Sequence, residues 1–356
     1  MIRRRFFLWL TLTTLTLFFT INPMPVPAAP KYTIKLGHFS IDKYPGDPPV
    51  VNAYIFKQYV ESLSNGDLEV KIYPNFQLGD VRAMMESTQM GATQATITYT
   101  SVFTIFAKKV ALTQIPFVFP NEEVAIRVMR GPFGRELAED VRKSVGIRVL
   151  NWADGCGFRQ IYSNKPIASP ADLKGMKLRV PENKGLLLLF KGIGAAPVTI
   201  SWAELYTALQ TGVAEGCETE IQSGVVIKLN EVQKYLTISR HSYNLQPLLM
   251  NEKFFKSLPP KYQEIILKAA DQADRAATGY SRTSELEAIQ TFIKGGMKVS
   301  YLSESQREEF KKLGQPPYIK WMEEEVGKEW LNKFLNAVKE AEAQWDKDVK
   351  ARAEAK

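Results

Sequence analysis

The chain has 356 residues, with 46 lysine and arginine residues against 38 aspartate and glutamate residues, and a formal net charge of +8 at pH 7. Hydrophobic residues make up 45% of it, so it can bury a large core, and its length predicts two domains. The basic residues are scattered among acidic ones and form no patch interleaved with aromatic residues, which argues against a nucleic-acid partner.

The amino terminus has the layout of a secretory signal peptide. The basic stretch MIRRR precedes an apolar run, Phe6 to Ile21, and NPMPVPAAP follows with small residues suited to cleavage. An uncleaved membrane anchor is the alternative, but the apolar run is shorter than the roughly 20 residues that a spanning helix needs. We predict cleavage after Ala28, so that residues 1–28 are a signal peptide and the mature protein is soluble and periplasmic.

The first half of the mature chain alternates strands and helices. Apolar residues at every second position predict strands over residues 32–38 and 68–74, and two further strands are predicted over 95–100 and 146–152. Helical spacing predicts two helices between the first three strands. The apolar face of the first is formed by Phe56, Tyr59, Val60 and Leu63, and that of the second by Met84, Met85 and Thr88.

The sequence MKLRV, residues 176–180, predicts a strand that ends at Pro181, because proline has no amide hydrogen with which to continue a sheet. Arg179 therefore lies at the carboxyl end of a strand. Open α/β sheets hold ligands in crevices outside these ends, and a guanidinium offers a fixed fork of donors that matches a carboxylate. A surface arginine paired with a nearby acid is the alternative, and the spacing alone leaves both roles open.

The second half of the chain adds further helices. Ser169-Pro170 predicts the start of a short helix, and residues 201–204 have the form of a capping box. Beyond Pro259 the pattern is helical, and its last part repeats aromatic and aliphatic residues at helical spacing. We interpret this stripe, formed by Trp330, Phe334, Val338, Ala341 and Trp345, as a packing face. Alternating strands and helices predict an α/β fold with mostly parallel sheets flanked by helices.

The sequence contains no recognisable catalytic or cofactor-binding motif. The two histidines, His38 and His241, lack the spacing of metal ligands. The stretch KGIGAAP, residues 191–197, lacks the third glycine of a dinucleotide loop, and the SGV at Ser223 is not a nucleophile elbow. We therefore predict no metal, no cofactor, no catalytic residue and no enzyme activity.

The segments DLKGMKLRVPENK (residues 172–184) and SWAELYTALQTGVAEGCET (residues 201–219) resemble the signature of the DctP-type substrate-binding proteins of tripartite ATP-independent periplasmic (TRAP) transporters. Further segments keep the order and spacing of that family from about residue 33 to residue 270. They are YPNFQLGDVRAMM (73–85), IPFVF (115–119), GFRQIYSNKPI (157–167) and NEVQKYL (230–236).

The resemblance implies a periplasmic binding protein fold with two α/β lobes and the ligand in the cleft between them. Lobe I is expected to comprise residues 29–154 and 244–280. Lobe II is expected to comprise residues 155–243 and 281–356, including the C-terminal helices. The implied partners are a small carboxylate ligand and the subunits of a TRAP membrane permease, to which the protein delivers its ligand.

The resemblance also assigns roles to particular residues. Arg179 matches the arginine that clamps the ligand's carboxylate, and Arg159 matches a second arginine that lines the cleft. Trp202 has the position of an aromatic residue that packs on the ligand. Thr219 stands where many members have the asparagine of an ENP motif, but the sequence here is ETE, with Glu220 in place of the proline.

Three further positions bear on the ligand. Phe39, Tyr99 and Val81 stand where members that bind sugar acids carry polar groups, so the cleft is expected to offer few partners for hydroxyl groups. Core packing is the alternative for Phe39 and Val81. We expect an aromatic or otherwise apolar monocarboxylate. The alternatives are a C4-dicarboxylate or a small hydroxy or keto acid, a ligand-binding component of a sensory system and, least supported, an enzyme on the same scaffold.

Cys156 and Cys217 are the only two cysteines, and the resemblance places both near the cleft. An oxidising periplasm favours a disulfide between them. Two small buried hydrophobic side chains are the equal alternative.

Overall fold

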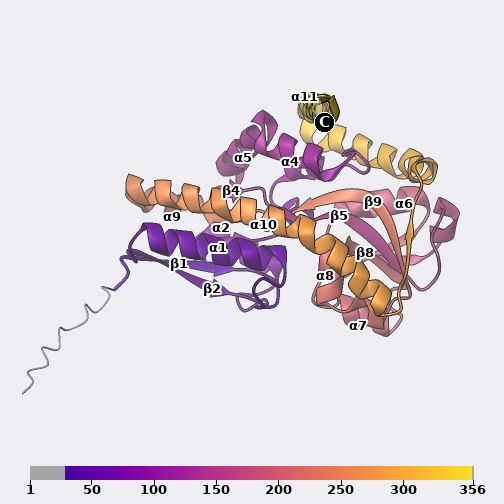
Figure 1. Cartoon of the computed structure of the whole chain (residues 1–356), viewed down its shortest axis with the longest axis horizontal. Helices are drawn as coiled ribbons and strands as arrows, with labels where there is room; N and C mark the ends of the chain where they lie inside the picture. The colour runs from indigo at the N-terminus through magenta and orange to yellow at the C-terminus, as the bar shows by residue number, and fades with distance from the viewer. Residues whose placement is uncertain (1–28, 355–356) are drawn as a thin grey trace, which may run out of the picture.

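The computed structural model describes residues 29–354 of the chain. The predicted signal peptide, residues 1–28, lies outside the described residues, and so does the side chain of Cys156. Two lobes lie side by side, each with its own sheet, and the long helix α10 (Pro260–Lys294) runs along both of them (Figure 1). The two-lobed α/β fold expected from the sequence is confirmed.

The sheet of lobe I has five strands in the order β2-β1-β3-β10-β4. β1 is parallel to β2 and β3, whereas β10 is antiparallel to β3 and β4. The sheet is therefore mixed, because the chain enters it a second time to add β10. The strands are β1 (Tyr32–Gly37), β2 (Leu68–Tyr73), β3 (Ala95–Ile97), β4 (Ile147–Asn151) and β10 (Leu248–Asn251).

The helices of lobe I begin where the sequence supplies caps. The Asp80 carboxylate accepts the amide hydrogen of Ala83 at the start of α2, and Gly91 ends that helix with a φ of 85°. The helical segments are α1 (Pro48–Leu63), α2 (Val81–Met90), α3 (Thr100–Phe103), η1 (Lys108–Gln114), α4 (Glu122–Arg130), α5 (Pro132–Val145) and α9 (Glu252–Ser257).

The sheet of lobe II has six strands in the order β11-β9-β5-β8-β6-β7. β6 is parallel to both β7 and β8, and β5 is antiparallel to β8 and β9. The strands are β5 (Asp154–Ser163), β6 (Lys177–Val180), β7 (Ala196–Thr199), β8 (Gly216–Glu220), β9 (Tyr235–Leu245) and β11 (Lys298–Tyr301). The helical segments are η2 (Pro170–Leu173), α6 (Lys184–Ile193), α7 (Leu205–Gln210), α8 (Ile221–Val226) and η3 (Leu229–Glu231).

The lobes are joined by strands and by one helix. β5 begins only a few residues after β4, and β9 leads through Leu245 into β10 of the other sheet. The boundary predicted near residue 281 falls inside α10, which packs on α1 of lobe I and on α8 and β5 of lobe II. A continuous helix, rather than a loop, therefore carries the third crossing.

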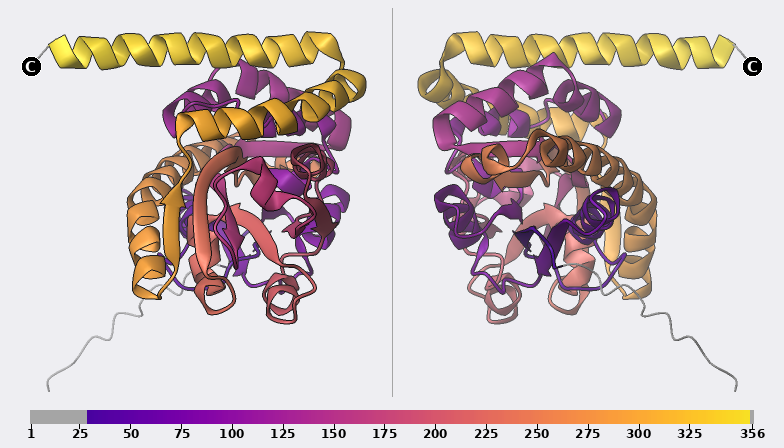
Figure 2. Two further views of the ribbon diagram at one scale, coloured as in Figure 1. Left: turned by 90° about the vertical axis from the view of Figure 1, so that its right-hand side faces the viewer. Right: turned by 90° about the vertical axis from the view of Figure 1, so that its left-hand side faces the viewer.

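The C-terminal helix α11 (Glu304–Glu354) is interrupted at Gly327, where φ is 81°. Its first part packs on α6 and η1 and its last part on α4, so α11 contacts elements of both lobes. Its last part extends beyond the body of the molecule (Figure 2). Phe334 and Val338 are buried and the other members of the predicted stripe pack around them, which confirms a packing face. Within residues 29–354 no helix combines the length and the apolarity needed to cross a bilayer.

One predicted helix face is partly wrong. Phe56 and Val60 of α1 are buried, but Tyr59 and Leu63 are 40% and 47% exposed. α1 packs on α10 and on β2 through the side that carries Ala53, Phe56 and Val60. Tyr59 and Leu63 lie at the edge of this contact because α10 covers a narrower stripe than the apolar residues provide.

Candidate ligand site between the lobes

Arg179 lies at the carboxyl end of β6, as the sequence predicts. It stands opposite Cys217 of β8 and Val198 of β7, and Pro181 follows directly after the strand. Although Lys177 shares its face of the strand and is exposed, Arg179 is only 1% exposed. Side chains of lobe I lie over this end of β6, so Arg179 is enclosed between the lobes.

The contacts of Arg179 leave most of its hydrogen-bonding capacity unused. Its Nε donates to the carbonyl oxygen of Ile200 at 2.8 Å, which fixes the direction of the side chain. Nη1 and Nη2 are buried and have no hydrogen-bond partner among the described residues. Burial lowers the pKa of Arg179, and Glu218 opposes this effect. A buried guanidinium with two free nitrogens is costly unless an acceptor comes to it.

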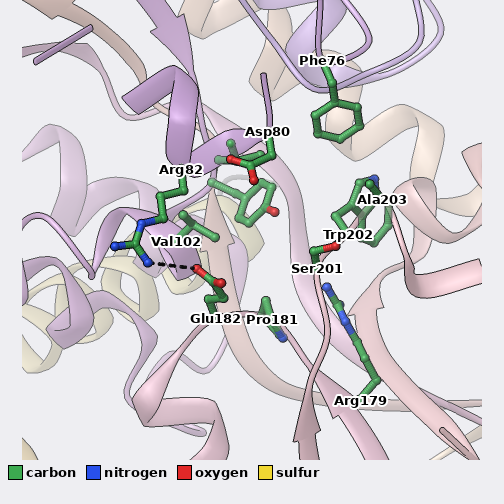
Figure 3. A pocket seen from close by; sticks show the side chains of 12 residues that line it. Phe76, Asp80, Arg82, Val102, Arg179, Pro181, Glu182, Ser201, Trp202 and Ala203 are labelled. Atoms are coloured by element: carbon green, nitrogen blue, oxygen red, sulfur yellow. Dashed lines mark ion pairs between the residues drawn. The ribbon is translucent and has the colours of Figure 1, made fainter. Parts of the chain in front are cut away.

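The hollow in front of Arg179 lies between the two lobes. It has a volume of about 50 Å³ and is lined by Phe76, residues 80–82, Tyr99 and Val102 of lobe I and by Arg179, Pro181, Glu182 and residues 201–203 of lobe II (Figure 3). An adjoining hollow of about 10 Å³ is also lined by Arg179. Arg82 of lobe I and Glu182 of lobe II form an ion pair at 3.9 Å beside it.

Lobe I provides an apolar wall. Phe39, Val81, Met84 and Val102 form a buried cluster against which Tyr99 and Phe76 pack. The rings of Phe39 and Tyr99 meet edge to face, with centroids 5.0 Å apart. The enclosure of Tyr99 raises its pKa to about 12, so its hydroxyl stays protonated. Phe39 and Val81 therefore have both roles, because they pack in this cluster and also line the hollow.

Lobe II provides a charged wall around Arg159, which is 3% exposed. Its Nε donates to Glu218, its Nη2 donates to the Glu218 carboxylate at 2.8 Å, and its Nη1 donates to Glu220 at 2.6 Å. Burial acts to lower the pKa of Arg159, but the two carboxylates outweigh it and raise the pKa. The pKa of Glu218 is lowered because Arg159 and His241 outweigh the effect of burial.

Trp202 and Thr219 also line the hollow. The Arg179 guanidinium lies 5.9 Å from the centroid of the Trp202 ring, within the range of a cation–π contact. Thr219 donates its hydroxyl to Glu220 at 2.8 Å, so this donor is engaged within the protein. The helix LYTALQT begins at Leu205 as predicted, but the predicted capping box is not formed, because the Ser201 hydroxyl donates to the Glu204 carboxylate.

Of the two alternatives for Cys156 and Cys217, the disulfide is not formed. Cys217 is a free, buried thiol, and burial raises its pKa to about 12. Its partner in the sheet is Tyr162 of β5. The backbone of residue 156 lies six residues away along that strand, a separation of roughly 20 Å, which no disulfide spans. Cys217 is instead a small buried side chain, as the other alternative expected.

The structure adds residues that the sequence did not bring to the site. Glu218 and Glu220 pair with Arg159, and Asn244 donates to Glu220 at 2.5 Å. His241 lies beside Glu218 at 3.2 Å, and burial lowers its pKa. One signal was present: two acidic residues at alternate positions of a buried strand share a face and need a cation there.

Comparisons with known proteins agree with this geometry. Residues 39–325 match the family described as bacterial extracellular solute-binding protein, family 7. The chain is 30% identical to the sialic acid-binding periplasmic protein SiaP of Vibrio cholerae, over 80% of this chain and 87% of that protein. It is also 30% identical to the C4-dicarboxylate-binding periplasmic protein DctP of Rhodobacter capsulatus, over 77% of this chain and 81% of that protein.

A solved structure with the same fold is the sugar acid binding protein DctPAm from Advenella mimigardefordensis in complex with galactonate. It has a TM-score of 0.82 and 30% sequence identity, over 88% of this chain and 99% of that chain. The fold and the comparisons therefore place the chain among the extracellular solute-binding proteins of bacteria. The chain belongs to the DctP-type family of TRAP solute-binding proteins.

Proposed function

We propose that this protein captures a small organic acid with a single carboxylate and an apolar body, and delivers it in the periplasm to a TRAP permease. The observation that carries the proposal is the pair of buried, unpartnered nitrogens, Nη1 and Nη2, of Arg179. A carboxylate can accept from both at once, and the water-poor surroundings strengthen such a pair. The family supports the permease and the periplasmic location.

The apolar wall of lobe I supports the rest of the ligand assignment. A ligand held at Arg179 extends toward Phe39, Val81 and Val102, which have no group that pairs with a hydroxyl. Hydroxyl groups of a sugar acid that face these three side chains stay unpaired, at about 1 to 3 kcal/mol each. An apolar body loses nothing of this kind and gains from burial.

Capture proceeds by movement of the lobes. The open form admits the acid to Arg179, and closure brings the lobe I wall over it and excludes water. The Arg82–Glu182 pair joins the lobes beside the hollow and stabilises the closed form. Since both of these side chains are about half exposed, the pair contributes little by itself, and the ligand supplies most of the closing energy.

The test is calorimetric titration of ligand-stripped protein with aliphatic and aromatic monocarboxylates, C4-dicarboxylates, and sialic and uronic acids. We expect micromolar binding of an apolar monocarboxylate. Arg179→Ala should weaken it by a factor of tens to thousands, since truncating one partner of a buried charge pair costs about 2 to 5 kcal/mol.

Arg275→Ala is the matched control, because it removes the same charge from an exposed position of α10. It should leave the affinity unchanged. Equal binding by Arg179→Ala and wild type contradicts the clamp, and binding of sugar acids alone contradicts the apolar body.

A further inference from the structure

Arg159 lines the same hollow as Arg179, but its guanidinium is hydrogen-bonded within the protein. Its Nε and Nη2 donate to Glu218, and its Nη1 donates to Glu220. Nη2 also donates to the carbonyl oxygen of Glu218 at 2.9 Å. All three nitrogens of this guanidinium thus have acceptors within the protein before any ligand arrives.

Glu220 is held firmly in the position that engages Arg159. Asn244 donates to one of its carboxylate oxygens, and Thr219 donates to the other. The Asn244 carbonyl oxygen in turn accepts from the Thr100 hydroxyl at 2.8 Å and from Gln114 at 3.1 Å, both in lobe I. A ligand that competes for Arg159 must therefore displace a carboxylate fixed by several other hydrogen bonds.

The charges of the group formed by Arg159, Arg179, Glu218 and Glu220 balance in the absence of ligand, and Asp80, which also lines the hollow, adds a further carboxylate that caps α2. Arg159 and Arg179 contribute two positive charges, and Glu218 and Glu220 contribute two negative charges, while the lowered pKa of His241 keeps it neutral. One ligand carboxylate can pair with the free end of Arg179. A second carboxylate on the ligand would find no unpaired cation in the hollow, because the nearby Arg82 already pairs with Glu86 and Glu182.

We propose that Glu220 is a specificity-determining residue that keeps Arg159 from the ligand and so excludes acids with two carboxylates. This inference rests on the proposed function and names the feature that narrows its ligand class. Without the charge of Glu220, Arg159 and Glu218 form a neutral pair, and the hollow gains a net positive charge that favours a dianion.

The first test uses wild-type protein and two pairs of acids with matched carbon chains, butyrate with succinate and hexanoate with adipate. In each pair the second acid has a carboxylate in place of the terminal methyl group of the first. Calorimetry at constant ionic strength should give tighter binding of the monoacid by at least about tenfold, because the added charge is buried without a partner. Equal or tighter binding of the diacids overturns the inference.

The second test uses Glu220→Gln. The new amide oxygen can still accept from Arg159 and Asn244, and the amide nitrogen can donate to the Thr219 hydroxyl, so the packing is conserved. The preference for the monoacid should fall by about tenfold or reverse. Glu215→Gln, at the exposed position just before β8, removes the same charge outside the hollow and should leave the preference unchanged.

The outcomes separate this inference from the proposed function. If wild-type protein binds none of the carboxylates, including the aromatic ones, the proposed function is wrong and this inference falls with it. If acids bind and Glu220→Gln keeps the wild-type preference, only the role of Glu220 is wrong. If circular dichroism reveals an unfolded Glu220→Gln protein, the wild-type comparison of monoacids and diacids decides.

Discussion

The two walls of the cleft are built in opposite ways. Lobe II contributes ionised groups, and all but one of their charges are paired inside the protein. Lobe I contributes mainly rings and aliphatic side chains that are buried by packing, and its charged residues at the hollow are Asp80 and Arg82. The difference follows from the cost of burial, since an apolar side chain needs only neighbours, whereas a charge needs a partner.

The two walls can therefore meet different parts of a ligand. Arg179 is the exception on the charged wall, and its incomplete pairing is what a ligand can complete. The apolar wall can accept many shapes but provides no anchor. Under the proposed function, the charged wall fixes the position of an acid and the apolar wall selects its body. Two predictions concern these walls and one concerns a buried acid where the chain leaves lobe I, and they follow in order of expected effect.

The largest effect concerns the pairing within the charged wall. Arg159→Met leaves Glu218 and Glu220 buried without their cation, so we expect it to lower the free energy of unfolding by about 3 to 5 kcal/mol. Urea unfolding of ligand-free protein measures this. The control is Arg179→Met, which loses one hydrogen bond to Ile200 but also removes an uncompensated charge, and should change stability by less than about 1 kcal/mol. Equal losses in the two variants contradict the distinction between a paired and an unpaired arginine.

The next effect concerns Asp154, at the point where β5 begins and the chain leaves lobe I. Burial raises the pKa of this carboxyl group from 3.8 to about 7, although Tyr243 opposes the rise. The folded protein therefore keeps this proton up to about pH 7, whereas the unfolded chain releases it near pH 4. Wild-type stability should accordingly fall as the pH rises from about 4 to about 7.

Asp154→Asn removes this dependence because its side chain stays neutral. We expect the variant to be more stable than wild type by about 1 to 4 kcal/mol at pH 8 and equally stable at pH 4. Urea unfolding at both pH values measures the difference, with Asp271→Asn on the exposed face of α10 as a control. A constant difference between wild type and Asp154→Asn across this range would show that burial of Asp154 is not the cause.

The smallest effect concerns the apolar wall. Phe39→Leu loses the edge-to-face contact with Tyr99 and some of the surface offered to a ligand, so affinity for an apolar monocarboxylate should fall by about fivefold. Phe56→Leu, in the lobe I core away from the hollow, should reduce stability without changing affinity. Calorimetry and urea unfolding of both variants give the comparison. An unchanged affinity in Phe39→Leu would assign that ring to core packing alone.

Local signals allowed much of the site to be predicted. Alternating residues and Pro181 indicated that Arg179 ends a strand, and the structure places it at the carboxyl end of β6. The aromatic stripe in the tail likewise indicated a packing face, and Phe334 and Val338 are buried in it. These features depend on a few consecutive residues, so their periodicity is visible in a short stretch of sequence.

The partners of these residues could not be predicted in the same way. Arg159 and Glu220 lie 61 positions apart and meet only because β5 and β8 are neighbours in one sheet. The same register separates Cys217 from residue 156 and rules out the disulfide. Sheet order is decided by how the whole lobe packs, and short sequence windows carry little information about it.

The sequence by itself determined the alternation of strands and helices, the family, and the position of an arginine at a strand end. Only the tertiary structure decided that Arg159 is neutralised by Glu218 and Glu220 while the terminal nitrogens of Arg179 stay without partners. The type of a side chain determines which hydrogen bonds it is able to form. Which of them it forms depends on its distance to acceptors that are remote in the sequence, and only the folded structure sets that distance.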